Sequence, residues 1–198
     1  PTRLKNLATI AFAQTKMIRG DFRAGLMHAV IFWGFLVVAL RTIFLFGQGI
    51  DSDFAQGFLA TPVGSGYTLL LNLFEILVLL AVGYALYRRL VVKPSRLTLS
   101  AEGIGILVAI ALLMVSDFLI DGSEMALEGL ADAHWAPAGA LVANLFLLGG
   151  VDPPSLVTIH KISFFSHIAL ILGFLNYLPY GKHFHIITFL PNVLFMRT

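Results

Sequence analysis

Four long apolar segments constrain this chain more than any other feature of its sequence. They lie near residues 25–46, 67–86, 102–120 and 155–187, and each reaches the roughly 20 residues that an α-helix needs to cross a bilayer. Hydrophobic residues make up 58% of the chain and charged residues only 12%, about half the charged share of a soluble domain. The mean hydropathy is +0.88. The sequence therefore predicts an all-α integral membrane protein, an antiparallel bundle of four transmembrane helices.

Charges are distributed unevenly over the segments that join these spans. The loops at 47–66 and 121–154 carry acidic side chains and no Lys or Arg, whereas residues 1–24 and the loop at 87–98 are basic. Loops rich in Lys and Arg stay on the cytoplasmic side of a membrane. We therefore expect residues 1–24 to form a cytoplasmic amphipathic arm, residues 25–198 to form the transmembrane domain, and both ends to be cytoplasmic. The apolar stretch at 138–148 is too short to span, so we expect a re-entrant or surface helix there.

Composition excludes several other classes of site. The chain contains no cysteine, which excludes a disulfide framework, a Cys-ligated zinc site and an all-Cys iron–sulfur cluster within this segment. The net charge of +2 does not indicate nucleic-acid binding, because the basic residues are confined to particular loops. The chain begins at Pro1 without a methionine, and we expect it to be part of a longer protein.

Three histidines recur along the last apolar segment. His160 and His167 are seven residues apart, and His167 and His185 are eighteen apart. In one continuous helix, eighteen residues make about five turns and about 27 Å, so these imidazoles would share one face. Ionisable side chains inside a span are costly and mark functional sites by default. Imidazole is also a common metal ligand and an axial ligand of haem iron.

A histidine of the first span lies at a depth that matches the last of these. The topology places His28 at the cytoplasmic start of the first span and His185 at the cytoplasmic end of the last. Two imidazoles from different helices at one depth can clamp a planar haem between axial ligands. We therefore predict that His28 and His185 ligate one haem iron.

Three segments resemble a known group of membrane proteins. They are Gly25-Leu-Met-His28-Ala-Val-Ile-Phe-Trp-Gly-Phe, Ile120-Asp-Gly-Ser-Glu-Met125 and Tyr177-Leu-Pro-Tyr-Gly-Lys-His-Phe-His185-Ile. The chain resembles the cytochrome b (gamma) subunit of respiratory nitrate reductase and the cytochrome b of membrane heterodisulfide reductase. It is closer still to the membrane domain fused to cysteine-rich iron–sulfur oxidoreductases. The resemblance implies a haem b bundle in a prokaryotic cytoplasmic membrane, with a fifth helix preceding residue 1.

The resemblance also implies roles for single residues. An inner haem b would be held by His28 and His185. Apart from the resemblance, Lys182 at the cytoplasmic surface would either neutralise the haem propionates or only extend its charge to the membrane interface. An outer haem would use His167 and a second histidine at the position that Val38 occupies here.

Because valine cannot ligate iron, three arrangements of the outer haem site stay open. His167 pairs with His134, His160 supplies the missing ligand, or the outer site is absent. One haem and two haems both stay open.

The predicted function is transfer of electrons between the quinone pool and a cytoplasmic iron–sulfur module, fused or separate, whose clusters lie outside this segment. The substrate would be menaquinone or another quinone. With an outer haem, the family precedent places the quinone pocket in the outer half of the bundle, near His160, Lys161 and Asp117. Two other classes remain as alternatives: a proton-coupled transporter, and a membrane anchor without redox chemistry.

Carboxyl groups in or near the spans also have more than one possible role. Glu75 lies near the middle of the second span, where an anion is costly, so we expect a protonated or paired carboxyl. It would serve either as a proton relay or as a hydrogen bond between helices. Asp117 and Asp121 lie at the outer end of the third span, and we expect a cap and a loop residue.

Overall fold

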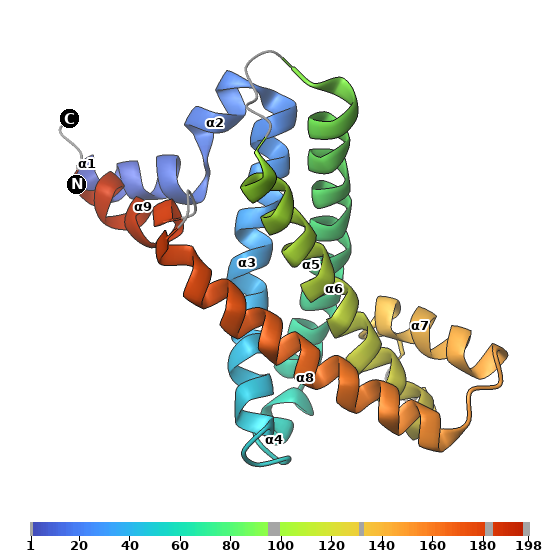
Figure 1. Cartoon of the computed structure of the whole chain (residues 1–198). Coiled ribbons are helices and arrows are strands. Elements are labelled where there is room, and N and C mark those ends of the chain that lie inside the picture. Colours follow the sequence, from blue (N-terminus) through green and yellow to red (C-terminus); the bar gives the residue numbers. More distant parts are fainter. Residues whose placement is uncertain (1, 95–99, 131–132, 181–183, 196–198) are drawn as a thin grey trace.

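Four long helices form the body of the protein. The computed structural model describes residues 2–94, 100–130, 133–180 and 184–195, and within these ranges the chain is helical without any strand. The helices of membrane length there are Phe22–Gln48 (α3), Pro62–Tyr87 (α5), Ala101–Glu128 (α6) and Pro153–Tyr177 (α8). Each runs opposite to the one before it (Figure 1). The expectation of an all-α protein with four apolar helices able to span a membrane is confirmed.

A side-chain cap sets the start of each long helix. Asp21, Thr61, Ser100 and Asp152 each accept a hydrogen bond from the backbone N–H three residues later, at 3.1, 3.1, 3.2 and 3.3 Å. Such caps stabilise a helix by about 0.5–2 kcal/mol each. A proline follows Thr61 and Asp152 at the first helical position, where its missing N–H has no partner to lose.

Helix α6 is longer than the apolar pattern predicts. The apolar run ends near residue 120, but the helix continues to Glu128. It stops at Gly129, whose φ of 91° lies in the left-handed region that glycine adopts without steric cost. Asp121 therefore lies within the helix, and its interpretation as a loop residue is wrong.

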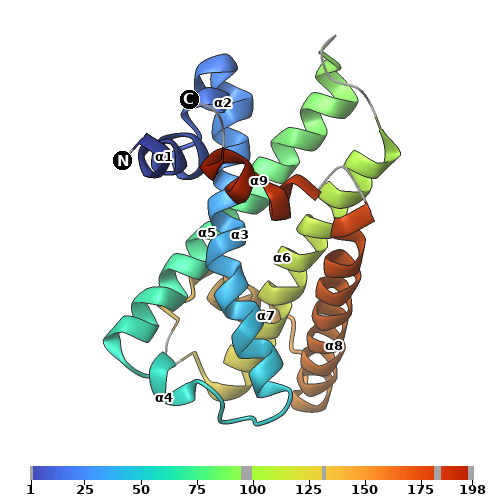
Figure 2. The same ribbon diagram turned by 90° about the vertical axis from the view of Figure 1, so that its left-hand side faces the viewer.

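The last apolar segment is broken into two helices. Helix α8 ends at Tyr177, a 3₁₀ turn follows at Leu178–Tyr180 (η3), and a separate helix, α9, occupies His185–Leu194. Pro179 explains the break, because proline lacks an amide N–H and disfavours helical backbone at the residue before it. Helix α9 leaves the axis of α8 and crosses toward the N-terminal helices (Figure 2). The single helical face expected for His167 and His185 is therefore wrong.

Helices α3, α5 and α6 share one apolar core. Val78 and Val82 of α5 and Met114 of α6 are buried there, and Val38 of α3 packs against them. A Cβ on Gly34 would lie 2.2 Å from Val78 Cγ2, so only glycine allows α3 to approach α5 this closely. Val38 occupies the position at which the resemblance implies a second histidine, and here its side chain packs in the apolar core.

The N-terminal arm lies at one end of the bundle, which we call the arm end. It comprises Thr2–Asn6 (α1), a π-helical turn at Leu7–Phe12 (η1) and Thr15–Gly20 (α2). Trp33 of α3 donates a hydrogen bond from Nε1 to the carbonyl oxygen of Phe12 at 3.1 Å. The Phe32 ring contacts Phe12 and also Phe189 of α9, with ring centroids 6.4 and 5.4 Å apart. Aromatic packing therefore joins the arm, α3 and α9.

Two further features fix the arm against the bundle. A Cβ on Gly25 would lie 2.5 Å from Ile18 Cα, so a larger residue would push α2 away from α3. The carboxylate of Asp21 binds Arg88 in the π-helical turn Arg88–Val92 (η2), with 3.0 Å between Oδ2 and Nη2. This hydrogen bond holds the pKa of Asp21 below its usual value.

The opposite end of the bundle, the loop end, carries two short helices. They are Gln56–Leu59 (α4) and Pro137–Leu148 (α7), both seen at the foot of the bundle in Figure 1. A Cβ on Gly122 of α6 would lie 2.5 Å from Val142, and one on Gly139 would lie 2.9 Å from Asp121 Cβ. Small residues on both helices therefore let α7 pack closely on α6.

Candidate functional site

The structure brings His28 and His185 together at the arm end. Their ring centroids are 6.4 Å apart and the ring planes are inclined by 34°. His28 is half-buried on α3, and His185 is the exposed first residue of α9. Since the two residues are 157 positions apart in sequence (185 − 28), their contact depends on the turn after Pro179 and on the packing of α9 against the arm.

Gln14 holds the His28 ring from the other side. Its Oε1 lies 2.8 Å from His28 Nδ1, which makes Nδ1 the protonated nitrogen and leaves Nε2 without its proton. Gln14 is 5% exposed and has a φ of 49°, a left-handed conformation that non-glycine residues seldom adopt. Such unfavourable backbone is typically retained where it serves a site. No sequence signal in the arm pointed to Gln14.

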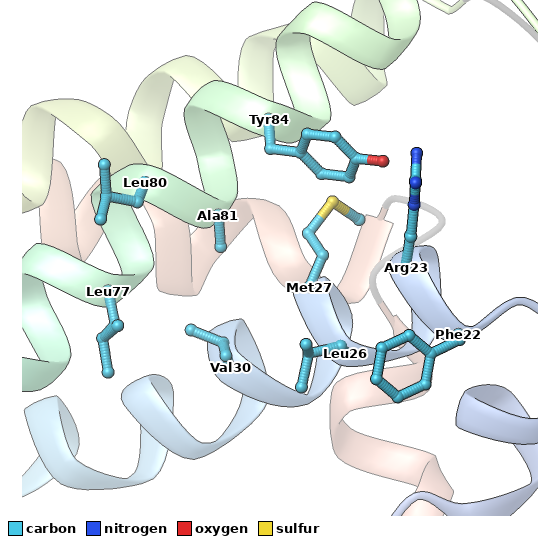
Figure 3. Close-up of a pocket in the computed structure, with 9 residues that line it drawn as sticks. All are labelled: Phe22, Arg23, Leu26, Met27, Val30, Leu77, Leu80, Ala81 and Tyr84. Carbon is cyan, nitrogen blue, oxygen red and sulfur yellow. The ribbon is translucent and has the colours of Figure 1, made fainter.

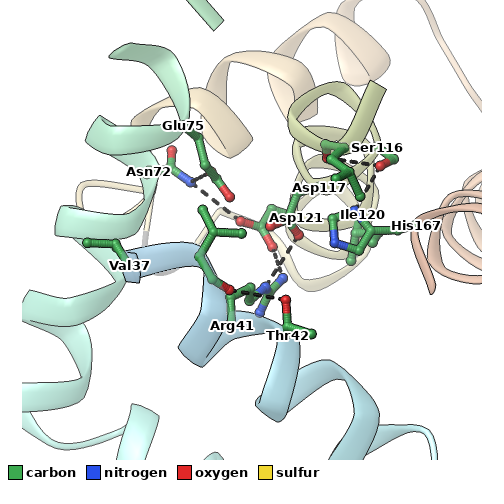
Figure 4. Close-up of polar contacts among 12 residues, drawn as sticks. Val37, Arg41, Thr42, Asn72, Glu75, Ser116, Asp117, Ile120, Asp121 and His167 are labelled. Atoms are coloured by element: carbon green, nitrogen blue, oxygen red, sulfur yellow. Dashed lines mark hydrogen bonds and ion pairs between the residues drawn. The ribbon is translucent and has the colours of Figure 1, made fainter. Parts of the chain in front are cut away.

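A second polar cluster lies inside the bundle toward the loop end (Figure 4). We call it the Arg41 cluster, and it comprises Arg41 of α3, Asn72 and Glu75 of α5, and Asp117 and Asp121 of α6. Arg41 Nε lies 3.3 Å from Asp117 Oδ1, and Arg41 Nη2 lies 2.5 Å from Asp121 Oδ1. Asn72, Glu75 and Asp117 are fully buried.

Asn72 connects this cluster to three helices. Its Nδ2 donates to Glu75 Oε2 at 3.3 Å and to Asp121 Oδ2 at 3.5 Å. Its Oδ1 accepts a hydrogen bond of 2.7 Å from the backbone N–H of Ala138, near the start of α7. The hydrogen bond between Asn72 and Glu75 lies within α5, so a proton relay and a hydrogen bond between helices both stay predictions for Glu75.

The remaining histidines are separated from one another. His167 is fully buried, with Nδ1 2.8 Å from Ser116 Oγ and with Nε2 lacking a hydrogen-bond partner. His160 Nδ1 lies 3.4 Å from Ser123 Oγ, and its ring stacks on Phe164. His134 is exposed beside Trp135. Among the described residues no ring contact joins His167 to another imidazole, so a second haem at His167 stays a prediction.

Two grooves on the bundle surface lie toward the arm end. One, of about 420 Å³, runs between α3 and α5 and is shown in Figure 3; Met27, Val30, Leu80 and Tyr84 are among its lining residues. The other, of about 380 Å³, lies between α6 and α8. Neither is lined by His160, Lys161 or Asp117. Lys161 is exposed on α8, whereas Asp117 is fully buried in the Arg41 cluster.

Lys182, which was expected near the haem propionates, lies outside the residues that the structure describes. Within the part of the chain that is described, no group of three or more His, Asp or Glu side chains is arranged to hold a metal ion. A haem iron takes at most two protein ligands, because the porphyrin nitrogens supply the others.

Comparison with known proteins relates the chain to larger oxidoreductases. It is 29% identical over 195 residues to a probable iron–sulfur-binding oxidoreductase, FadF, of Bacillus subtilis, and the match covers 98% of this chain and 27% of that protein. It is also 29% identical over 209 residues to an EtfAB:quinone oxidoreductase of Syntrophomonas wolfei, covering 98% of this chain and 28% of that protein. The chain thus spans about a quarter of the length of these relatives.

The comparisons support one part of the expected resemblance. Similarity to an iron–sulfur-binding oxidoreductase and to a quinone oxidoreductase agrees with a membrane-bound oxidoreductase of the iron–sulfur kind. No family model matches the chain, and no solved structure matches it. The likeness to the nitrate reductase gamma subunit and to heterodisulfide reductase cytochrome b stays an expectation.

Replacement of Arg41 should destabilise the bundle strongly. The change Arg41→Gln leaves the carboxylates of Asp117 and Asp121 buried without their cation, and removing one partner of such a pair typically costs about 3–5 kcal/mol. The matched control is Arg88→Gln, whose bridge to the exposed Asp21 is screened by solvent and should contribute little to stability. Thermal unfolding in detergent measures both. Equal midpoints for the two variants would contradict the ion pairs of the Arg41 cluster.

Proposed function

We propose that this chain is the membrane domain of an iron–sulfur oxidoreductase and carries electrons between a quinone and a cytoplasmic iron–sulfur module. The observation that carries the proposal is the His28–His185 pair, which joins the membrane-length helix α3 to the short helix α9 in a chain similar to an iron–sulfur-binding and a quinone oxidoreductase. The chain has no cysteine of its own, so the clusters belong to another domain or subunit.

The two imidazoles fit haem b as a shared cofactor. A metal-bound imidazole has its nitrogen about 2 Å from the metal and its ring centre about 1 Å further, so two imidazoles on one iron have ring centres about 6 Å apart. The separation of 6.4 Å between the His28 and His185 rings agrees with this. The bond to Gln14 occupies Nδ1 of His28 and leaves Nε2 for a metal.

The protein's own part is to hold these ligands. Haem b would supply a centre that accepts and releases one electron. Gln14 keeps His28 in one tautomer and orientation, and acceptors of this kind make a ligating imidazole more basic. Phe32 and Phe189 pack α3 against α9 and thereby hold His185 near His28. Neutralisation of the propionates by Lys182, which lies outside the described residues, stays a prediction.

The quinone would bind in the half of the bundle toward the loop end, near His160, Lys161 and Asp117. His160 is held by Phe164 and Ser123 on the same half of α8 and α6. Lys161 is exposed beside it and offers a cation and a proton donor. The substrate would be menaquinone or another quinone. The rival location is the groove between α3 and α5, which is lined by Met27, the residue before His28 in the sequence (Figure 3).

Replacement of either ligand should remove the same haem. His28→Ala and His185→Ala each eliminate one of the two axial bonds, so both variants should lose the haem b absorbance of the purified full-length protein. A pyridine haemochrome assay measures haem per chain, and each ligand variant should contain one haem fewer than the parent protein. Lys93→Gln is the control, because Lys93 is an exposed residue at the arm end with no proposed ligand role, and this change should leave the haem content unchanged. Full haem retention in either ligand variant would exclude the pairing.

Substitution near the proposed quinone pocket should separate catalysis from haem binding. His160→Ala and Lys161→Gln should lower electron transfer with a soluble quinone analogue by at least about tenfold, the loss of roughly one good hydrogen bond to the reacting molecule. The haem spectrum should stay intact in both. Lys93→Gln, which changes an exposed lysine at the arm end, is the control. Undiminished turnover in both pocket variants would favour the groove between α3 and α5.

A further inference from the structure

The Arg41 cluster contains more acidic groups than cations. Glu75, Asp117 and Asp121 face a single guanidinium, and the only other titratable side chains that act on them are Tyr67 of α5, the exposed Glu124 of α6 and His167 of α8, among the residues that the structure describes. Helices α4 and α7 contribute no charge there. Three carboxylates and one guanidinium would leave two negative charges inside an apolar bundle, which is costly.

The hydrogen bonds identify which carboxyl lacks a cation. Arg41 forms ion pairs with Asp117 and Asp121, at 3.3 and 2.5 Å. Glu75 receives only the Asn72 Nδ2 donor at 3.3 Å. Two fully buried oxygens, Glu75 Oε1 and Asp117 Oδ2, have no donor in the described part of the protein, although the two carboxyl groups lie within hydrogen-bonding reach of each other. An ionised carboxyl only accepts hydrogen bonds, so the two carboxyl groups can hydrogen-bond to each other only if one of them carries a proton.

We propose that Glu75 and Asp117 share one proton and form a proton-binding site inside the membrane-spanning bundle. Glu75 carries the proton and donates it to Asp117, while Asp117 and Asp121 keep their ion pairs with Arg41. The site then holds one net negative charge in place of two. This assignment does not depend on haem or quinone, and it applies equally if the chain has another redox role.

The cluster also provides a route for that proton. Glu75 and Asp117 are fully buried, whereas the side chains of Asp121 and Arg41 are 12% and 11% exposed. Asn72 bridges Glu75 to Asp121 through hydrogen bonds of 3.3 and 3.5 Å. Asn72 donates in both hydrogen bonds and so cannot itself relay a proton, but Asp121 is the partly exposed carboxyl of the cluster, and a proton would enter or leave on its side, toward the loop end. In a domain that reacts with a quinone, whose reduction takes up two electrons and two protons, such a site can store one of those protons; this last role rests on the proposed function.

Infrared spectroscopy of the full-length protein tests the shared proton directly. At neutral pH the protein should show a carbonyl-stretch band of a protonated carboxylic acid, which shifts to lower frequency after exchange into D₂O. Glu75→Gln should abolish this band. Glu128→Gln is the matched control, since Glu128 is exposed at the end of α6, and it should leave the band unchanged. Persistence of the whole band in Glu75→Gln would overturn the proposal.

The stability of the same variant provides a second, independent test. The amide of Glu75→Gln has the shape of a protonated carboxyl and can donate to Asp117, so the thermal midpoint in detergent should equal that of the parent protein. A variant that fails to fold, or that melts well below the parent, would contradict a protonated Glu75. Both measurements are made without reference to haem content, so their outcome is separate from that of the electron-transfer proposal.

Discussion

The ion pairs of Arg41 organise the loop-end half of this bundle. Apolar side chains gain little by leaving lipid for one another, so helix association in a membrane depends on close packing and polar contacts. Arg41 of α3 binds two carboxylates one turn apart on α6, and Asn72 of α5 extends the cluster to Glu75 and to the start of α7. A rotation of α3, α5 or α6 would leave a buried charge without its partner. The polar cluster therefore fixes how these helices face one another, while Gly34 and Gly139 allow them to approach.

The two proposed sites lie toward different ends of the bundle. His28 and Arg41 are thirteen residues apart on α3, which corresponds to about 20 Å along the helix. The arm end holds a pair of imidazoles suited to a metal cofactor, and the Arg41 cluster holds carboxyls suited to a proton. A domain that passes electrons toward a cytoplasmic module while exchanging protons near its other end needs this separation. The arm contributes directly, because Gln14 binds His28 and Phe12 packs on Phe32.

Much of this arrangement could be predicted from sequence, and the predictions that failed did so for physical reasons. Apolar length predicts the four long helices, and the placement of His28 and His185 at one depth agrees with their contact. The shared face expected for His167 and His185 failed because it assumes one continuous helix, whereas the helix ends before Pro179 and His185 lies on α9. Asp121 was misplaced because an acidic residue within a helix needs Arg41 as a partner, and that partner is 80 positions away in sequence. Gln14 and Asn72 carried no signal, since a lone amide acquires its role only from what folding brings beside it.

Reduction of the purified full-length protein by a hydroquinone, followed in the visible region, tests the central claim most directly. If His28 and His185 hold a haem b that exchanges electrons with quinone, the oxidised protein should show a Soret band. Addition of the hydroquinone should sharpen the α band and shift the Soret band as the iron is reduced. A protein without these bands, or with iron–sulfur absorbance alone, would contradict a haem-based electron path through this domain.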